Sequence, residues 1–111
     1  VRVCLDTCHM FAAGHDIRTA DVWEKTFAEF ESRIGFDRLA CVHTNDSKMP
    51  FNSRKDRHEH VGKGEIGIEA FRLLMNDPRF AQVPKILETP KDDKMTEDFE
   101  NLAVLKRLVL S

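Results

Sequence analysis

The stretch "CLDTCHMFAAGHD", residues 4–16, places a carboxylate and an imidazole directly after a short apolar run. The chain starts with "VRVCLD", residues 1–6, and this mostly apolar segment predicts a β-strand that ends at Asp6. His9 follows three residues later. Whether this pair has a role beyond local structure depends on how the other strands of the chain end.

Outward from this stretch, strands and helices are predicted to alternate along the chain. Two more strands are predicted over residues 38–44 ("RLACVHT") and 84–88 ("PKILE"). Helices are predicted over residues 21–35, 67–77 and 93–110, and loops over residues 11–20 and 45–65. The order β-α-β-α-β-α indicates an α/β protein with a parallel sheet and right-handed crossovers.

The first and last helices carry apolar stripes at helical spacing. In the first helix the stripe is formed by Trp23, Phe27, Phe30 and Ile34. Asp21 is expected to cap the start of this helix and Gly35 to end it. In the last helix the stripe is formed by Met95, Phe99, Leu102, Leu105 and Val109. We interpret these stripes as core positions.

Length and composition indicate one soluble globular domain. The chain has 111 residues, of which 41% are hydrophobic and 32% charged. No apolar stretch reaches the roughly 20 residues of a membrane-spanning helix, and no secretory signal is visible. Since the chain begins with Val1 inside a predicted strand, we expect it to be part of a longer chain. A complete (β/α)8 barrel needs about 250 residues, so if the longer protein is such a barrel, this chain contains less than half of it.

Three cysteines without a CxxC pair argue against a disulfide framework and favour a reducing, intracellular setting. Cys4 and Cys41 lie in apolar runs, where a free cysteine acts as a small hydrophobic residue. Cys8 lies beside Asp6 and His9, and we interpret it as a packing residue, with a metal ligand as the lesser alternative. The net charge of -2 neither indicates nor excludes a nucleic-acid partner.

Each predicted strand ends at a side chain that can bind a metal ion. These residues are Asp6, His43 and Glu88. One such residue alone is most often a cap or a partly buried polar group. Because the carboxyl ends of parallel strands form one face of the molecule, three together favour a shared site.

The predicted loop at residues 45–65 adds the motif "DRHEH". Asp56, His58 and His60 alternate with other residues, so they share one side of an extended segment. Aspartate and neutral histidine are good zinc ligands. A ligand set of carboxylates and imidazoles without thiolate suggests catalytic zinc, with manganese as an alternative.

Three segments of the chain resemble the endonuclease IV family of apurinic/apyrimidinic (AP) endonucleases. They are "VCLDTCH" at residues 3–9, "HTNDSKMPFNSRKDRH" at residues 43–58 and "ILETP" at residues 86–90. The resemblance covers essentially the whole chain, as the C-terminal part of a single-domain enzyme. Arg2 and Lys63 depart from the usual pattern of the family, and neither is a proposed ligand.

The resemblance implies a fold and a set of ligands. The fold is α/β, the C-terminal part (about three βα units) of a TIM (β/α)8 barrel. Its carboxyl face would hold a trinuclear zinc site, with Asp6, His43 and Glu88 on one zinc ion as the catalytic residues. His9, Asp56 and His58 would bind a second ion. The remaining ligands of the family come from earlier strands, which this chain does not contain, and His60 matches no ligand position.

The resemblance also implies a function in base excision repair of DNA. The expected reaction is hydrolysis of the phosphodiester 5′ to an abasic site, which leaves a 3′-hydroxyl. Clustered metal ions suit this chemistry because they polarise phosphoryl oxygens and activate water. The partner would be DNA with abasic sites, contacted through its phosphates by Arg57, Lys48 and Arg54. We expect a monomer with no membrane partner, cytoplasmic in a bacterium and nuclear or mitochondrial in a eukaryote.

Two alternatives remain at this point. The first is a metal-dependent sugar isomerase on a xylose isomerase-like barrel, which would share Asp6, His43 and Glu88. The additional ligands His9, Asp56 and His58 favour the nuclease over the isomerase. The second is a fragment that binds zinc but lacks activity, which we expect for these 111 residues in isolation.

Overall fold

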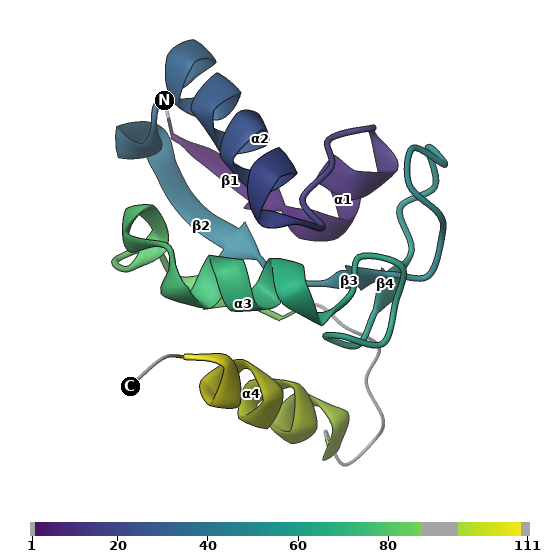
Figure 1. Ribbon diagram of the computed structural model, residues 1–111. Helices are drawn as coiled ribbons and strands as arrows, with labels where there is room; N and C mark the ends of the chain where they lie inside the picture. The colour runs from purple at the N-terminus through teal and green to yellow at the C-terminus, as the bar shows by residue number, and fades with distance from the viewer. Residues whose placement is uncertain (1, 88–95, 110–111) are drawn as a thin grey trace.

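The computed structural model describes residues 2–87 and 96–109, with side chains from residue 100 onward in the second segment. Strands β1 (Val3–Asp6), β2 (Leu39–His43) and β5 (Lys85–Ile86) form a sheet in the order β1-β2-β5 (Figure 1). Both neighbouring pairs are parallel, which confirms the predicted parallel sheet. The predicted ligand Glu88 lies outside the described residues.

The register of β1 and β2 assigns their side chains to two faces. Three pairs are in register: Cys4 with Cys41, Leu5 with Val42, and Asp6 with His43. Successive side chains of a strand point to opposite faces, so the Leu–Val pair lies on one face and the other two pairs on the opposite face. We call the face with Cys4, Cys41, Asp6 and His43 the polar face. A register shift between Val3 and Cys4 precedes these pairs.

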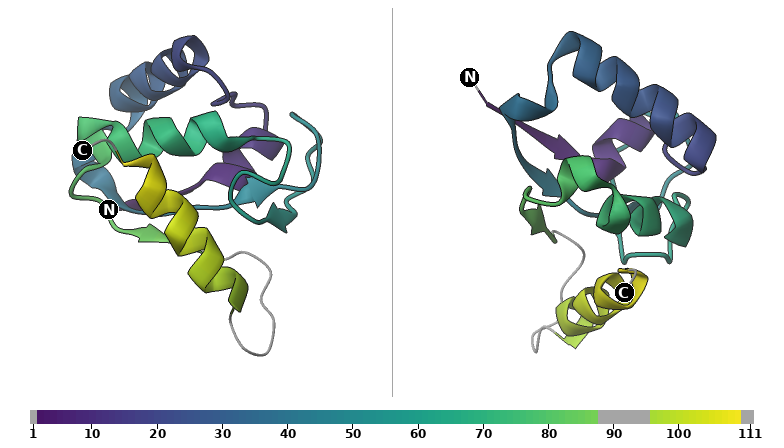
Figure 2. Two further views of the ribbon diagram at one scale, coloured as in Figure 1. Left: turned by 60° about the horizontal axis from the view of Figure 1, so that its bottom comes forward. Right: turned by 60° about the vertical axis from the view of Figure 1, so that its left-hand side comes forward.

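Two helices cover the other face. Helices α2 (Ala20–Arg33) and α3 (Ile68–Asn76) lie on the same side of the sheet (Figures 1 and 2). Trp23, Phe27 and Phe30 of α2 are buried, as predicted. The ring of Phe27 lies 4.5 Å from that of Trp23 and 5.0 Å from that of Phe80, measured between centroids. Aromatic contacts therefore dominate the core between sheet and helices.

The ends of α2 differ in part from the prediction. The predicted cap Asp21 is wrong: Thr19 is the N-cap residue, and Asp21 lies in the first turn, where its charge favours the helix dipole. Ile34, predicted on the core face, is 43% exposed because it leaves helical geometry as the C-cap residue. Gly35 ends the helix as predicted, with a φ of 99° that favours glycine. The 3-10 helix η1 (Phe36–Arg38) then leads into β2.

A short helix that the sequence analysis missed follows β1 directly. Helix α1 (Thr7–Ala12) includes the first two residues of the predicted loop 11–20. Asp6 is its N-cap residue, and the carboxylate Oδ1 accepts a hydrogen bond of 3.1 Å from the backbone N–H of His9. The spacing of Asp6 and His9 is thus that of an N-cap and the third helical residue.

The predicted loop 45–65 contains a two-stranded antiparallel sheet of β3 (Asp46–Ser47) and β4 (His58–Glu59). Helix α3 agrees with the predicted second helix, and the 3-10 helix η2 (Pro78–Phe80) follows it.

The described part of the last helix is α4 (Thr96–Leu108), which ends before Val109, whereas the prediction ran to residue 110. Its predicted stripe is partly wrong: Leu105 is buried, but Leu102 is 45% and Val109 47% exposed. Asn101 and Leu108 are buried instead, because Asn101 accepts from the Val61 N–H and the Leu108 carbonyl accepts from a side chain of α3. Of Met95 and Phe99, the first lies outside the described residues and the side chain of the second is not described. None of the described helices combines the length and apolar content needed to cross a membrane.

Candidate metal centre

The carboxyl ends of β1 and β2 place two predicted ligands side by side. Asp6 and His43 are register partners on adjacent parallel strands. Neighbouring strands lie about 4.8 Å apart, and paired side chains leave the sheet on the same face. The sheet therefore presents one carboxylate and one imidazole together at its carboxyl edge.

The segment before and within β4 adds three donor atoms to this edge. His58 Nε2 lies 3.3 Å from Asp6 Oδ2 and 3.4 Å from Asp56 Oδ1. The second oxygen of Asp56, Oδ2, lies 3.6 Å from His9 Nδ1. Carboxylates and imidazoles thus alternate in the order Asp6, His58, Asp56, His9. The structure brings these four predicted ligands together although 52 positions separate the outermost, from 6 to 58.

The spacing of these donors fits a zinc ion. Oxygen and nitrogen donors at about 2.0–2.2 Å from a tetrahedral ion lie roughly 3.3–3.6 Å from each other. The three distances between His58, Asp6, Asp56 and His9 fall in this interval. They exceed the usual hydrogen-bond distance of about 2.7–3.2 Å. Neighbouring members of the series are therefore spaced as donors on a shared ion would be. The series is not one mutually close set, because among the described residues at this edge the donor atoms that all lie within 4.8 Å of one another are those of Cys8, Asp56 and His58.

Local structure fixes the orientation of Asp6. Its Oδ1 accepts from the His9 N–H as the cap of α1, and its Oδ2 is the atom near His58. One side chain therefore both starts the helix and faces the candidate site. The His9 side chain, one turn into α1, is 69% exposed and so accessible to a ligand from solvent.

The side chain of Asp46 ties the segment 64–67 to β3, the strand that pairs with β4, a role that no sequence pattern predicted. Its buried carboxylate accepts hydrogen bonds from four backbone N–H groups, those of Ser47, Gly64, Ile66 and Gly67. Burial raises the pKa of Asp46 despite these bonds. A side chain at Gly64 would collide with the Ser47 carbonyl and the Asp46 carboxylate, so only glycine fits. No short-range signal reveals this contact, since the partners beyond Ser47 lie 18 to 21 residues away.

The side chain of Cys8, interpreted from the sequence as a packing residue, lies next to two of the proposed ligands. Its Sγ donates to the Arg57 carbonyl at 3.3 Å, and its sulfur lies within 4.8 Å of donor atoms of Asp56 and His58. Burial, followed by the hydrogen bond with Asp56, raises the pKa of Cys8 to about 12. With no metal ion present this favours the protonated thiol, and the position of the sulfur among the donor atoms of Asp56 and His58 keeps the metal-ligand alternative for Cys8 open.

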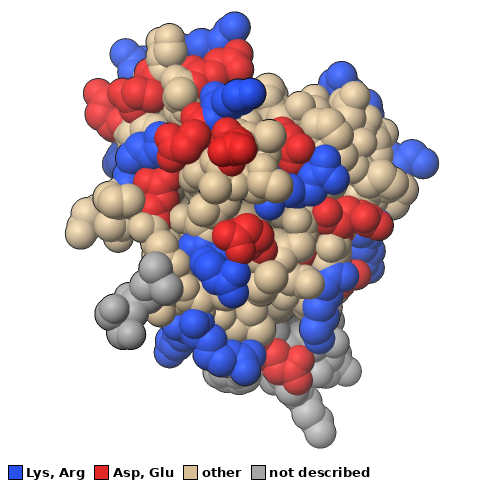
Figure 3. Space-filling model, in the orientation of Figure 1, with Lys and Arg blue, Asp and Glu red and all other residues tan. Residues whose placement is uncertain are grey.

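The three predicted phosphate contacts are exposed on the loop beside the site. Lys48 donates its backbone N–H to the Arg57 carbonyl at 2.9 Å, so the loop is closed there. Arg57 Nη1 donates to the Asp56 carbonyl at 3.1 Å, and the Arg54 N–H donates to the Ala12 carbonyl at 2.9 Å. On the face of the molecule in Figure 3, basic and acidic side chains are interspersed and form no single basic patch.

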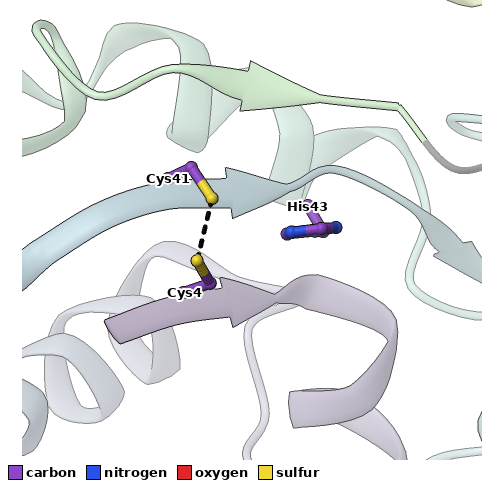
Figure 4. A group of neighbouring side chains, drawn as sticks. All are labelled: Cys4, Cys41 and His43. Atoms are coloured by element: carbon purple, nitrogen blue, oxygen red, sulfur yellow. Dashed lines mark hydrogen bonds between the residues drawn. The ribbon is translucent and has the colours of Figure 1, made fainter. Parts of the chain in front are cut away.

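Two predicted residues face other partners. The His60 ring nitrogen Nδ1 lies 3.0 Å from Asn101 Nδ2 of α4, so His60 belongs to the contact with that helix. His43 has donor atoms within 4.8 Å of both sulfurs of Cys4 and Cys41 (Figure 4). Cys4, which we interpreted as a small hydrophobic residue in an apolar run, is exposed on the polar face. The signal was present, because Cys4 and Cys41 each precede a predicted ligand by two residues.

Comparison with known proteins agrees with this fold. The family model described as "Xylose isomerase-like TIM barrel" matches residues 1–108. In the solved structure of endonuclease IV from Thermus thermophilus, the matching part has a TM-score of 0.85 and 37% sequence identity. That match covers 97% of this chain and 38% of the other.

Two relatives among curated proteins are more similar in sequence. A "Probable endonuclease 4" of Geobacter sulfurreducens is 59% identical over 107 residues, 96% of this chain and 36% of the relative. A "Probable endonuclease 4" of Chloroflexus aggregans is 58% identical over 107 residues, 96% of this chain and 37% of the relative. The chain thus spans little more than a third of the length of the proteins that it matches. It belongs to the xylose isomerase-like TIM barrel family and, within it, to the endonuclease IV group.

Proposed function

We propose that this chain is the C-terminal part of a zinc-dependent AP endonuclease that hydrolyses the phosphodiester 5′ to abasic sites and leaves 3′-hydroxyl ends. The observation that carries the proposal is the alternating series of two carboxylates and two imidazoles at the carboxyl edge of the sheet. The names of the relatives support a nuclease. The donor distances support zinc.

In this proposal the chain contributes ligands to two of three zinc ions. Asp6, His43 and Glu88 hold one ion, and His9, Asp56 and His58 hold another. The 3.3 Å distance between Asp6 Oδ2 and His58 Nε2 supports an arrangement in which the two sets adjoin. When bound, zinc supplies Lewis acidity toward phosphoryl oxygens and activates water as a nucleophile.

The side chains of the chain itself prepare the site for these ions. Asp6 and Asp56 provide negative charge on both sides of His58, which favours a cation between them. The capping bond from the His9 N–H to Asp6 fixes the orientation of that carboxylate before any ion binds. Asp46 fixes the segment 64–67 against β3, whose backbone pairs with the strand that carries His58.

Basic residues of the loop would position the DNA. Arg57 lies between two proposed ligands in sequence, and its guanidinium has five N–H donors, so a phosphate contact is compatible with its bond to the Asp56 carbonyl. Lys48 and Arg54 are exposed nearby in the same loop. Their contribution would be independent of base sequence and sensitive to salt.

The isolated chain should bind zinc weakly and show little nicking activity. It spans 36% to 38% of the relatives and of the solved structure, and the remaining ligands are expected in the part that it lacks. Incomplete coordination leaves each ion with fewer bonds, so affinity falls. Robust nicking by the purified 111-residue chain would contradict this.

The test of the function uses a full-length protein that contains this chain and a duplex with one abasic site. We expect a single nick 5′ to the site, with an end that a DNA polymerase extends, and zinc in the purified protein. Asp6→Asn should abolish nicking, whereas Asp16→Asn, a carboxylate paired with Arg18, should leave it intact. Conversion of an aldose to a ketose without nicking would instead establish the isomerase alternative.

A further inference from the structure

The polar face of the sheet carries a second layer of metal-binding groups. Cys4 and Cys41 are register partners, and they lie two residues before the register partners Asp6 and His43. The period of two along a strand puts all four side chains on the same face. In Figure 4 the two sulfur atoms point toward each other, and His43 lies on the same face beyond them.

The geometry of this layer suits a soft metal ion. The sulfur atoms of Cys4 and Cys41 lie 3.0 Å apart, and both lie within 4.8 Å of a ring nitrogen of His43. Thiolates at about 2.3 Å from a tetrahedral ion lie roughly 3.8 Å from each other. The sulfurs need to separate by less than about 1 Å, which rotation about the Cα–Cβ bonds provides without a backbone shift.

We propose that Cys4, Cys41 and His43 form a site for a thiophilic divalent cation such as Zn²⁺ or Cd²⁺. Two thiolates and one imidazole are the ligands that such ions prefer over carboxylate sets. On binding, two metal–sulfur bonds form and the two thiols release their protons to solvent. The resulting dithiolate neutralises the charge of the dication.

This site shares His43 with the proposed ligand set of Asp6, His43 and Glu88 but uses no other residue of it. A soft ion in the cysteine layer would engage the imidazole that the proposed nuclease site requires. The cysteine layer would therefore make the protein sensitive to thiophilic cations. The inference does not depend on the proposed function, because it concerns the affinity of three side chains for a metal ion.

The experiment titrates Cd²⁺ into the reduced 111-residue chain and follows the ultraviolet charge-transfer absorption from thiolate to cadmium. All variants carry Cys8→Ser, so that the buried third thiol does not contribute. We expect one Cd²⁺ per chain with the absorbance of two thiolates. Cys4→Ser and Cys41→Ser should each halve the band and weaken binding at least tenfold.

The histidine distinguishes an assembled site from two reactive thiols. His43→Gln should keep the band and weaken binding roughly tenfold, about 1.4 kcal/mol. His60→Gln, whose ring faces α4, is the matched control and should leave the affinity unchanged. Equal affinities of the His43→Gln variant and its parent, or equal effects of both histidine variants, would overturn the proposal. So would a band that persists in full after either cysteine is replaced. None of these outcomes bears on DNA cleavage, so the nuclease proposal stands or falls separately.

Discussion

The two faces of the β1–β2 pair are built from alternate residues of the same strands and serve different ends. Leu5 and Val42 face α2 and α3 and contact an aromatic core. Asp6 and His43, each one residue further along, face the polar side and carry donor atoms. A strand of only four or five residues can therefore contribute apolar side chains to the core on one face and donor atoms to the candidate site on the other. Substitutions on one face should leave the property of the other unchanged.

The strongest test of this separation is Phe27→Ala on the helix-covered face. Phe27 is 2% exposed and its ring contacts those of Trp23, Phe30, Phe36 and Phe80. Loss of the ring leaves a cavity, and we expect about 3–5 kcal/mol lower free energy of unfolding. Urea unfolding followed by the fluorescence of Trp23 measures this. Phe51→Ala, at a ring that is 36% exposed, should cost about 1 kcal/mol or less, and an equal loss would contradict the assignment of the core.

On the polar face, Asp6→Asn should lower zinc affinity about a hundredfold, about 2.8 kcal/mol. Asparagine is as good an N-cap as aspartate, so α1 should persist and only the charge is lost. The measurement is competition with a chromophoric zinc chelator, in a chain with Cys4→Ser to remove the thiolate layer. Asp16→Asn is the control, and a similar loss there would show that the effect is general rather than local.

A smaller effect is expected for Asp77→Asn, again on the helix-covered side. Burial alone raises the pKa of Asp77, but hydrogen bonds from Arg79 and from the Trp23 indole outweigh it and hold the pKa below its usual value. The charged form therefore stabilises the fold above the ordinary pKa of about 3.9, and this contribution is lost as pH falls through the lower folded pKa.

At pH 7 the Asp77→Asn variant should be about 1–2 kcal/mol less stable than the parent chain, and the two should converge in strong acid. Thermal unfolding between neutral pH and pH 2.5, which is about 1.4 units below the ordinary value, tests this. A difference that stays constant across this range would mean that the charge of Asp77 is irrelevant.

The smallest effect concerns the loop beside the polar face. Arg57→Gln in the full-length protein should weaken binding to abasic DNA about threefold, about 0.6 kcal/mol, and reduce the salt slope by about one. Arg33→Gln, which removes an equal charge at the last residue of α2, is the control. If both variants bind DNA equally well, the loop makes no phosphate contact through Arg57.

The sequence predicted the larger features of the fold because they depend on periodicity. The stripe of Trp23, Phe27 and Phe30 and the alternation of strands and helices follow from local spacing. Helix α1 was not predicted, because its six residues are too few to show a helical periodicity of apolar residues. Cys4 was interpreted as a small hydrophobic residue because it lies in an apolar run, but among the described residues nothing buries it and it is exposed.

The sequence indicated which residues lie near one another in the candidate site, but it did not indicate their spacing. Strand ends and the DxH motif indicated Asp6, His9, Asp56 and His58, and the structure brings them together. The prediction assigned Asp6 and His58 to different metal ions and did not include the short distance between their side chains. Their status as ligands stays a prediction, and Glu88 lies outside the described residues. The role of Asp46 depends on contacts across 18 or more residues, which local patterns do not encode.

The register shift near the start of β1 has a consequence for the whole site. Val3 pairs with Leu39, but Cys4 pairs with Cys41, so Ala40 is an extra residue on β2. Leu39 and Val42 both enter the core although they are an odd number of positions apart, which a regular strand does not permit. If residues 39–43 formed an uninterrupted strand with Leu39 in the core, Val42 would face away from the core and the imidazole of His43 would face the phenylalanine rings. The irregularity at Ala40 thus decides whether that histidine lies on the polar face or in the hydrocarbon core.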